Sequence, residues 1–211
     1  TLSERSWCCE HGHRFDIAKQ GYVNLLPVQH KRSKDPGDSK EMVAARQRFL
    51  NAGFYKEIAE ALSDLALEAL PVEEIGSVLD AGSGEGYYLR HLSAMAGNIG
   101  LALIGVDISK WAVLAAAKQD KQTRWVVGSN ANLPVLPESL DLVLCLFGFP
   151  VYSEFARVLK PGGQVIQVDA GAYHLRELRE VIYPEVKPPG DSESAAPEGF
   201  RQLDSTVVRF P

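Results

Sequence analysis

The sequence contains few cysteines and no long apolar run, and each absence excludes a class of protein. Three cysteines among 211 residues are too few for the disulfide framework of a small secreted domain. No uninterrupted apolar segment reaches the length of about 18 residues that a membrane span needs. The first residues show no basic and apolar leader with a small-residue cleavage site. We therefore expect a cytoplasmic protein that does not contact a membrane.

Negative residues outnumber positive ones in the chain as a whole, and only the front segment has a positive excess. The formal net charge is −5. Residues 1–60 carry 10 Lys and Arg against 8 Asp and Glu, whereas residues 61–211 carry 12 against 19. An acidic chain is poorly suited to broad nonspecific binding of nucleic acid. Any contact with a polyanion is expected near the front segment.

Strand-like and helix-like patterns alternate from residue 75 onward. Before them, two helical patterns are separated by Gly53, and Ser39 is the expected N-cap of the first. The predicted strands span residues 75–81, 101–107, 124–128, 140–146 and 164–169, and the predicted helices between and after them span residues 87–95, 109–119, 152–159 and 174–183. Continuous apolar strands between helices are typical of a parallel sheet covered on both faces. The pattern predicts an α/β fold with an open, doubly wound, Rossmann-like sheet.

A glycine-rich turn, VLDAGSGEG at residues 78–86, ends the first of these strands and begins its helix. Glycines allow the backbone to turn sharply and to approach a ligand closely. Asp107 ends the second strand, 21 residues after Gly86. From that position a carboxylate can accept hydrogen bonds from both ribose hydroxyls. The sequence therefore predicts a ribose-containing ligand at the carboxyl edge of the sheet.

The details of the turn select among nucleotide ligands. The spacing is G-x-G-x-G, and Glu85 stands at the helix start, where its carboxylate would repel a pyrophosphate. A P-loop is excluded because no Gly-Lys-Ser/Thr follows. A nucleoside with a cationic tail fits better, and S-adenosylmethionine is such a molecule. The alternative is a tight strand-to-helix junction without a ligand, which Asp80, Asp107 and the LKPGG turn at 159–163 make less favourable.

These same residues resemble the motifs of class I S-adenosylmethionine-dependent methyltransferases. The resemblance extends to the front of the chain, through CEHGHRFD at 9–16, GYVNLL at 21–26 and HKRSKDPGD at 30–38. With EGYY at 85–88 and HLREL at 174–178, the chain resembles bacterial 23S ribosomal RNA guanine-N1 methyltransferases of the RlmA type. The resemblance implies a small N-terminal zinc-ribbon-like module, a methyltransferase domain, and methyl transfer to N1 of a guanine in a hairpin loop of 23S ribosomal RNA. It also implies a possible homodimer.

The resemblance suggests two domains, a zinc-module remnant with a basic linker at residues 1–38 and the methyltransferase domain at 39–211. Cys9 and His13 match a family Cys-x-x-x-His pair of zinc ligands. A preceding Cys-x-x-Cys pair has no counterpart, because only seven residues precede Cys8. Since a structural zinc needs four ligands, we expect zinc to be held weakly or lost, and a solvated Cys/His loop is the alternative. We expect further residues beyond both ends.

Cofactor contacts are expected along the turn, at Asp107, and at three other places. Asp80, Gly82, Gly84 and Glu85 belong to the turn, and the resemblance assigns Gly84 and Glu85 to the cofactor. It also assigns Tyr55 and His174. An aromatic face near a sulfonium has a cation–π rationale, although Tyr55 could equally serve packing.

The position that usually accepts a hydrogen bond from the adenine amino group has no carboxylate in this sequence. The alignment brings Ser129 and then Asn130 there, and we assign Asn130 to the adenine. Either side chain could form the bond.

Two further segments leave alternatives open. FGFP at 147–150 lacks the Asn/Asp-Pro-Pro-Tyr/Phe signature of exocyclic-amine methylation, which favours a ring nitrogen. Its aromatic rings either stack on an extruded base or pack in the core. The basic run of Lys31, Arg32 and Lys34 either positions RNA phosphates or is a solvated face.

The sequence identifies no catalytic base. Two other functions stay open for the whole chain: a methyltransferase acting on a small molecule, and a non-catalytic scaffold that binds S-adenosylmethionine.

Overall fold

The computed structural model describes residues 2–3, 6–26, 36–72, 74–184 and 196–210. The basic run at 31–34 and its predicted contact with RNA lie outside these residues. The main strands are β4 (Tyr22–Asn24), β5 (Gly76–Ala81), β6 (Leu101–Asp107), β7 (Arg124–Val127), β8 (Leu140–Leu146) and β9 (Leu159–Val168). The helices are α1 (Lys40–Asn51), α2 (Lys56–Ala69), α3 (Tyr87–Ala96), α4 (Lys110–Gln119), α5 (Tyr152–Val158) and α6 (Arg176–Ile182). No described helix is both long and apolar enough to cross a bilayer.

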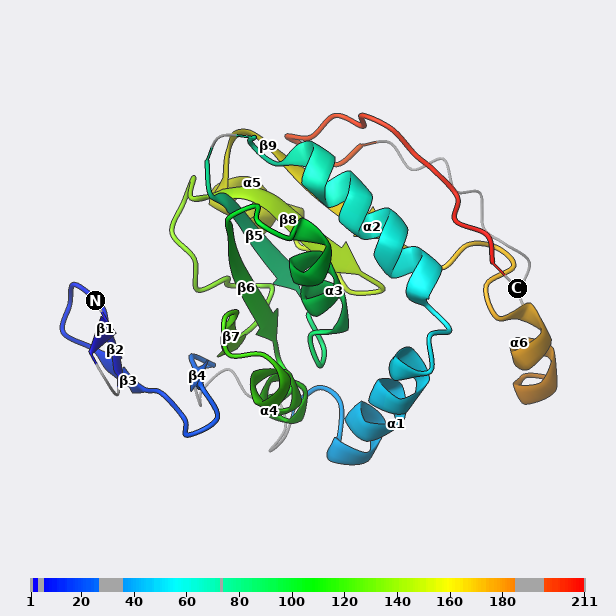
Figure 1. The fold of residues 1–211 in the computed structure, drawn as a ribbon, viewed down its shortest axis with the longest axis horizontal. Helices are drawn as coiled ribbons and strands as arrows, with labels where there is room; N and C mark the ends of the chain where they lie inside the picture. The colour runs from blue at the N-terminus through cyan, green and yellow to red at the C-terminus, as the bar shows by residue number, and fades with distance from the viewer. Residues whose placement is uncertain (1, 4–5, 27–35, 73, 185–195, 211) are drawn as a thin grey trace.

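The six main strands form one sheet in which all neighbours are parallel. Their order is β4-β7-β6-β5-β8-β9 (Figure 1), so the strand order reverses between β5 and β8. In open sheets of this kind, ligands bind beyond the carboxyl ends of the strands at this reversal. The predicted doubly wound α/β fold is therefore confirmed.

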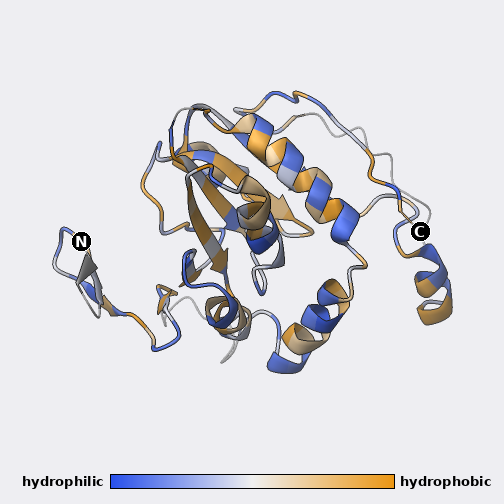
Figure 2. Cartoon of the chain, viewed as in Figure 1, coloured by the Kyte–Doolittle hydropathy of each residue, from blue (hydrophilic) through white to orange (hydrophobic). Residues whose placement is uncertain are grey.

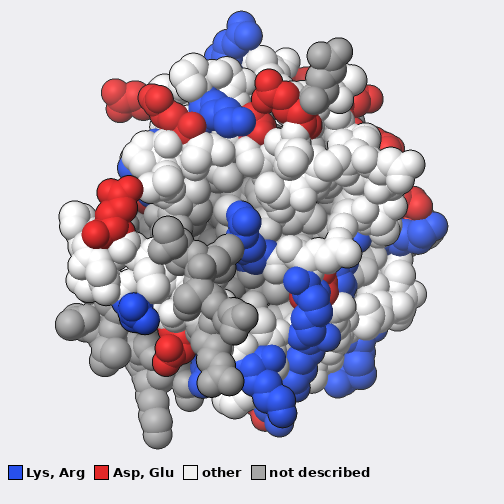
Figure 3. All heavy atoms as spheres, turned by 60° about the vertical axis from the view of Figure 1, so that its left-hand side comes forward, with Lys and Arg blue, Asp and Glu red and all other residues white. Residues whose placement is uncertain are grey.

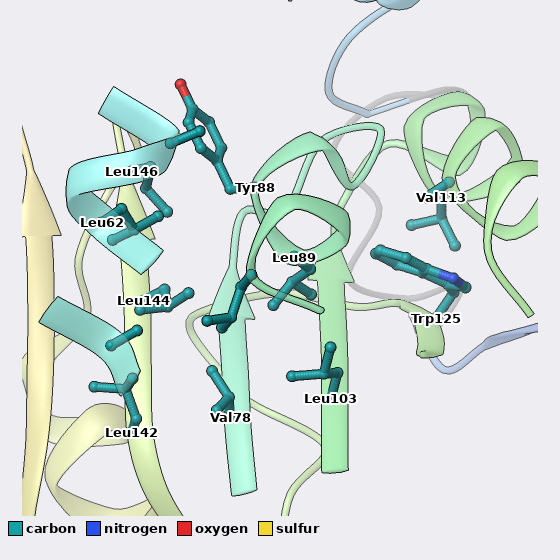
Figure 4. Packing of buried hydrophobic residues seen from close by; sticks show 14 of the residues in the cluster. Leu62, Val78, Tyr88, Leu89, Leu103, Val113, Trp125, Leu142, Leu144 and Leu146 are labelled. Carbon is teal, nitrogen blue, oxygen red and sulfur yellow. The ribbon is translucent and has the colours of Figure 1, made fainter. Parts of the chain in front are cut away.

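Both faces of the sheet are covered, and neighbouring residues of one strand serve opposite faces. Val78 packs under α2, α3 and α4, whereas Leu79 packs under α5. Both side chains are fully buried, and burial of such a side chain contributes roughly 1.5–3 kcal/mol. Figure 4 shows the first cluster, with Leu89 of α3 above Val78 and Leu103. In Figure 2 the central strands are correspondingly orange, and the helices carry one apolar and one polar side.

The third glycine of the turn is required by the core. Gly86 has a φ of 80°, and a Cβ there would lie 2.4 Å from Cη2 of Trp125. Trp125 is the largest fully buried side chain among the described residues. Its indole Nε1 donates to the carbonyl of Asp120 over 3.0 Å. The indole therefore fixes the start of α3 against β7.

The helices before the sheet begin as predicted. Ser39 caps α1, and its Oγ accepts a hydrogen bond from the amide of Met42 over 3.3 Å. Gly53, at a φ of 88°, separates α1 from α2. Such a conformation is unfavourable for residues that have a Cβ.

The structure differs from the prediction at both edges of the large sheet and in the last helix. No strand is predicted before residue 75, yet β4 lies at one edge of the sheet, paired with β7. A second, antiparallel sheet consists of β1 (Leu2–Ser3), β2 (Ser6–Cys8) and β3 (Arg14–Asp16).

At the other edge, β9 begins at Leu159 rather than at residue 164, because Leu159 pairs with Leu140 before a register irregularity. The last predicted helix is shortened to α6, which buries none of its side chains.

Candidate cofactor site

The glycine-rich turn follows β5 at the carboxyl edge of the sheet. The amides of Gly82 and Ser83 both donate to the carbonyl of Val106, over 2.8 and 3.0 Å, which holds the turn against β6. Gly82 and Gly84 have φ values of 98° and 55°. The backbone of the turn is thus bent away from the strand, and a ligand can approach it closely.

Asp107 connects the turn to the end of β6. One of its carboxylate oxygens accepts from the amide of Gly84 over 2.9 Å, and the other from the amide of Ser109 over 2.7 Å. Desolvation raises the pKa of Asp107, and the two amide hydrogen bonds oppose that shift. Each carboxylate oxygen retains a lone pair beyond these bonds. The side chain is therefore oriented by the protein and still able to accept from a pair of ribose hydroxyls.

Asp80 is a buried carboxyl without a partner. The residue is 1 % exposed, and neither of its carboxyl oxygens has a hydrogen-bond partner among the residues that the structure describes. Desolvation, and secondarily the charge of Asp107, raises the pKa of Asp80 to about 8. A buried carboxyl is costly unless a donor or a cation accompanies it. Its place in the turn fits a ligand that carries a cationic group, as S-adenosylmethionine does in its amino-acid tail.

The side chain of Glu85 is buried between α3 and α4. It is 2 % exposed. Its Oε2 accepts from a guanidinium nitrogen of Arg90 over 3.0 Å and from Nε2 of Gln119 over 2.7 Å, between α3 and α4. Glu85 stands directly before Gly86, the N-cap of α3, as the sequence predicts, and Arg90 and Gln119 hold its carboxylate there. A cofactor contact by the Glu85 main chain stays a prediction.

Asn130 lies at the same edge of the sheet, where its amide is already engaged. Its Nδ2 donates to the carbonyls of Ala81 and Phe149 over 3.3 and 3.4 Å. The side chain thus connects the end of β5 to the loop after β8. Its predicted contact with adenine stays a prediction, and the bonds that the structure describes serve the protein itself.

Tyr55 and His174 were predicted separately, and the structure brings them together. The Tyr55 hydroxyl and Nε2 of His174 are 2.9 Å apart, although 119 residues separate them in the sequence. The ring of Phe147 is 5.7 Å from that of Tyr55 and 5.6 Å from that of His174. Burial, with a contribution from Arg179, lowers the pKa of His174. These three rings form an aromatic cluster beyond the ends of β8 and β9.

Sequence reasoning missed a second charged pair near the turn. Arg46 of α1 forms an ion pair with Asp38, and a Cβ on Gly84 would lie 4.0 Å from a guanidinium nitrogen of Arg46. The Oγ of Ser109 donates to the carbonyl of Asp38 over 2.7 Å. The segment before α1 is thereby attached to the end of β6. Arg46 stands in a helix with an ordinary amphipathic pattern, which carries no signal of this contact.

The predicted zinc ligands are neighbours in a short loop. Sγ of Cys9 and Nδ1 of His13 are 3.2 Å apart, and the loop is closed by a hydrogen bond from the amide of Cys9 to the carbonyl of His13. Within the described part of the chain, no group of three or more His, Cys, Asp or Glu side chains could hold a metal ion. A tetrahedral zinc site needs four ligands, so these two side chains could supply at most half of one.

Comparison with known proteins identifies the family. The profile of the RlmA N-terminal zinc ribbon matches residues 1–34, and that of a methyltransferase domain matches residues 78–163. A Bacillus subtilis protein named "Putative 23S rRNA (guanine-N(1)-)-methyltransferase" is 35% identical over 198 residues, which cover 92% of this chain and 68% of that protein. The chain belongs to the RlmA-type 23S rRNA guanine-N1 methyltransferase family.

Other relatives agree with this family. The 23S rRNA (guanine(748)-N(1))-methyltransferase of Streptomyces fradiae is 35% identical, with 85% of this chain and 63% of that protein covered. The chain thus spans about two thirds of the length of these relatives.

Solved structures support the fold. The methyltransferase in complex with the Trm112 activator of Haloferax volcanii has a TM-score of 0.52 and 27% identity, with 68% of this chain and 66% of that chain covered. An S-adenosylmethionine-dependent methyltransferase of Methanococcus maripaludis has a TM-score of 0.52 at 23% identity, with 72% and 73% covered. At the latter identity the likeness concerns the fold alone.

Proposed function

We propose that this chain transfers the methyl group of S-adenosylmethionine to N1 of a guanine in a hairpin loop of 23S ribosomal RNA. The observation that carries the proposal is the identity of about 35% to 23S rRNA guanine-N1 methyltransferases over most of the chain. The buried, unpartnered Asp80 beside an oriented Asp107 supports it, because this pair suits a nucleoside with a cationic tail.

The residues of the turn have distinct tasks in this proposal. Asp107 accepts from the ribose hydroxyls, and Asp80 faces the cationic end of the ligand. Gly82 and Gly84 allow the main chain to lie against it. Tyr55 and His174, joined by their hydrogen bond, lie on the far side of β5 from Asp107. When bound, S-adenosylmethionine supplies a methyl group activated by its sulfonium.

The chain contributes mainly alignment to the reaction. Holding two reactants in line removes much of the entropic barrier of a bimolecular displacement. Guanine N1 carries a proton, which must leave as the bond to the methyl carbon forms. A path for that proton to a base or to water is therefore required.

Zinc, the domain division and the homodimer are proposed on the resemblance. Cys9 and His13 would supply half of a zinc site, and further ligands would have to come from elsewhere. The division into residues 1–38 and 39–211 separates the two functions, although β4 of the front part belongs to the large sheet. The homodimer stays a prediction.

Two rival functions make different predictions. A methyltransferase acting on a small molecule would methylate its substrate without ribosomal RNA, and the zinc-ribbon match at residues 1–34 would have no task. A non-catalytic scaffold would bind S-adenosylmethionine and transfer nothing. The buried carboxyl of Asp80 favours a ligand in either case, and the relatives favour RNA as the acceptor.

The decisive experiment uses tritium-labelled S-adenosylmethionine and 23S ribosomal RNA from a strain that lacks the corresponding modification. We expect label in one nuclease fragment, with 1-methylguanosine after digestion. Ribosomal RNA from the modified strain is the matched control, and it should accept no label. Absence of label from the unmodified RNA, together with normal cofactor binding, would refute the proposed function.

A further inference from the structure

The loop after β8 is held firmly over the end of β5. The amide of Phe147 donates to the carbonyl of Val168 over 2.8 Å. The carbonyl of Phe149 accepts from Nδ2 of Asn130 over 3.4 Å, and the same amide group donates to the carbonyl of Ala81. The loop is therefore attached to the end of β9 and, through Asn130, to the end of β5, and it lies at the point where the strand order reverses.

The two phenylalanines of this loop are in opposite situations. Phe147 is partly covered by the aromatic cluster with Tyr55 and His174. Phe149 is 90 % exposed, and no aromatic ring packs against it in the part of the chain that the structure describes. The sequence left open whether these rings pack or stack on a base, and the structure separates the two uses.

The backbone of Phe147 is in an unusual conformation for a bulky residue. Its φ is 51°, in the left-handed region. Such conformations persist only where the surrounding structure enforces them, and they cluster at functional sites. An exposed aromatic residue alone would need no explanation. Here it stands two residues after a strained position, in a loop whose carbonyl is clamped by Asn130.

The loop also lies where the methyl acceptor has to enter. Asp107 at the end of β6 marks the ribose side, and Asp80 at the end of β5 marks the tail. β8 is the next strand on the other side of β5, so the loop after β8 lies across β5 from Asp107. N1 of a guanine becomes accessible only when the base leaves its stack, and an extruded base is commonly received by aromatic side chains.

Charged side chains are unevenly distributed over one face of the molecule. In the face shown in Figure 3, Asp and Glu gather toward the top, and Lys and Arg are more frequent in the lower half. This face is the left-hand side of Figure 1, where β4 and β7 lie.

We propose that Phe149 is the surface on which the extruded target guanine stacks, and that Asn130 is a positioning residue that holds its loop. This inference rests on the proposed function and names the part of the chain that receives its substrate. Phe147, in contrast, serves the aromatic cluster.

The test compares three substitutions in the full chain with 23S ribosomal RNA as substrate. Phe149→Ala should lower kcat/KM for the RNA by about 5- to 150-fold, the range for loss of one aromatic stacking partner. It should leave the calorimetric dissociation constant of S-adenosylmethionine unchanged. Phe149→Trp should retain most of the activity, because its ring can also stack. Val72→Ala is the control, since Val72 is 97 % exposed and precedes β5 at the opposite edge of the sheet.

A second measurement reports on the base itself. With 2-aminopurine in an RNA fragment at the position that the wild-type chain methylates, stacking on Phe149 should quench the fluorescence of the extruded base. The same RNA bound to Phe149→Ala should fluoresce more strongly. Equal fluorescence and equal kcat/KM in the two proteins would overturn the inference while the proposed function stands. If Phe149→Ala loses as much affinity for S-adenosylmethionine as it loses in kcat/KM, the loop contacts the cofactor instead of the base. A wild-type chain that methylates no 23S RNA refutes the proposed function, and the inference with it.

Discussion

Substitution of Asp80 by Asn gives a prediction that separates folding from ligand binding. The carboxyl is buried without a partner, and burial raises the pKa of Asp80 from 3.8 to about 8. In the unfolded chain the same group titrates near its ordinary pKa. Between these two values the folded protein therefore binds more protons than the unfolded chain. Its stability must fall as the pH rises through this window.

The magnitude follows from the size of the shift. One pKa unit corresponds to about 1.4 kcal/mol, so the free energy of unfolding should fall by nearly that amount per pH unit on account of Asp80. Between pH 5 and pH 8 the loss amounts to about 3–4 kcal/mol. Asp80→Asn removes the titrating group. The stability difference between the variant and the wild type should therefore shift by this amount in favour of the variant.

The assay is urea unfolding of both proteins at several pH values without cofactor. Asp141→Asn is the matched control on the neighbouring strand. Desolvation alone would raise the pKa of Asp141, but hydrogen bonds from Lys160 and Ser77 and the charge of Lys160 outweigh it, so the pKa is lowered. The contribution of the Asp141 carboxylate to stability is present at neutral pH and is lost as the pH falls through the lowered pKa. If the difference between wild type and Asp80→Asn is the same at pH 5 and pH 8, the carboxyl is not a buried, unpartnered group.

Three other substitutions test the site, the core and the front segment. Asp107→Ala should weaken the binding of S-adenosylmethionine by roughly 1.5–3 kcal/mol. An unchanged calorimetric dissociation constant in a folded variant would mean that another residue holds the ribose. Gly86→Ala should lower the free energy of unfolding by about 1–3 kcal/mol or more, because its Cβ would meet Trp125, and urea unfolding measures this loss. Gly12→Ala is the control, because Gly12 has open space around it and its substitution reports the cost of the positive φ alone. The double substitution Lys31→Ala/Arg32→Ala should leave cofactor affinity unchanged and reduce RNA methylation, and this reduction should be smaller at low salt. Loss of cofactor affinity together with RNA methylation would show that the segment folds over the cofactor site.

The regular part of the fold was predictable because its signals are local. Apolar runs, glycine turns and the Ser39 cap lie within a few residues of the elements they define. The edge strand β4 was not predictable in the same way. It has three residues, and it is stabilised by a partner, β7, that lies far along the chain. The sequence around Val23 shows an apolar stretch, and nothing in it specifies that partner.

The site was predictable in its composition and less so in its geometry. Tyr55 and His174 were selected by resemblance, and their hydrogen bond follows only from the packing of α2 against the segment after β9. The inward turn of Glu85 depends on Arg90 and Gln119, one and two helices away. A motif records which residue types stand together in the chain. It does not record which long-range partner a side chain selects.

The edge position of β4 has a consequence for the order in which the protein is assembled. During synthesis the front segment leaves the ribosome first, yet its partner β7 is made only after β5 and β6. Parallel pairing over such a sequence separation is slow, because a large loop must close before any contact compensates for it. The first strand of the large sheet to be synthesised is therefore among the last to be incorporated. Until then the Cys/His loop before it has no fixed position relative to the glycine-rich turn, so the front segment and the candidate cofactor site are joined at a late step of folding.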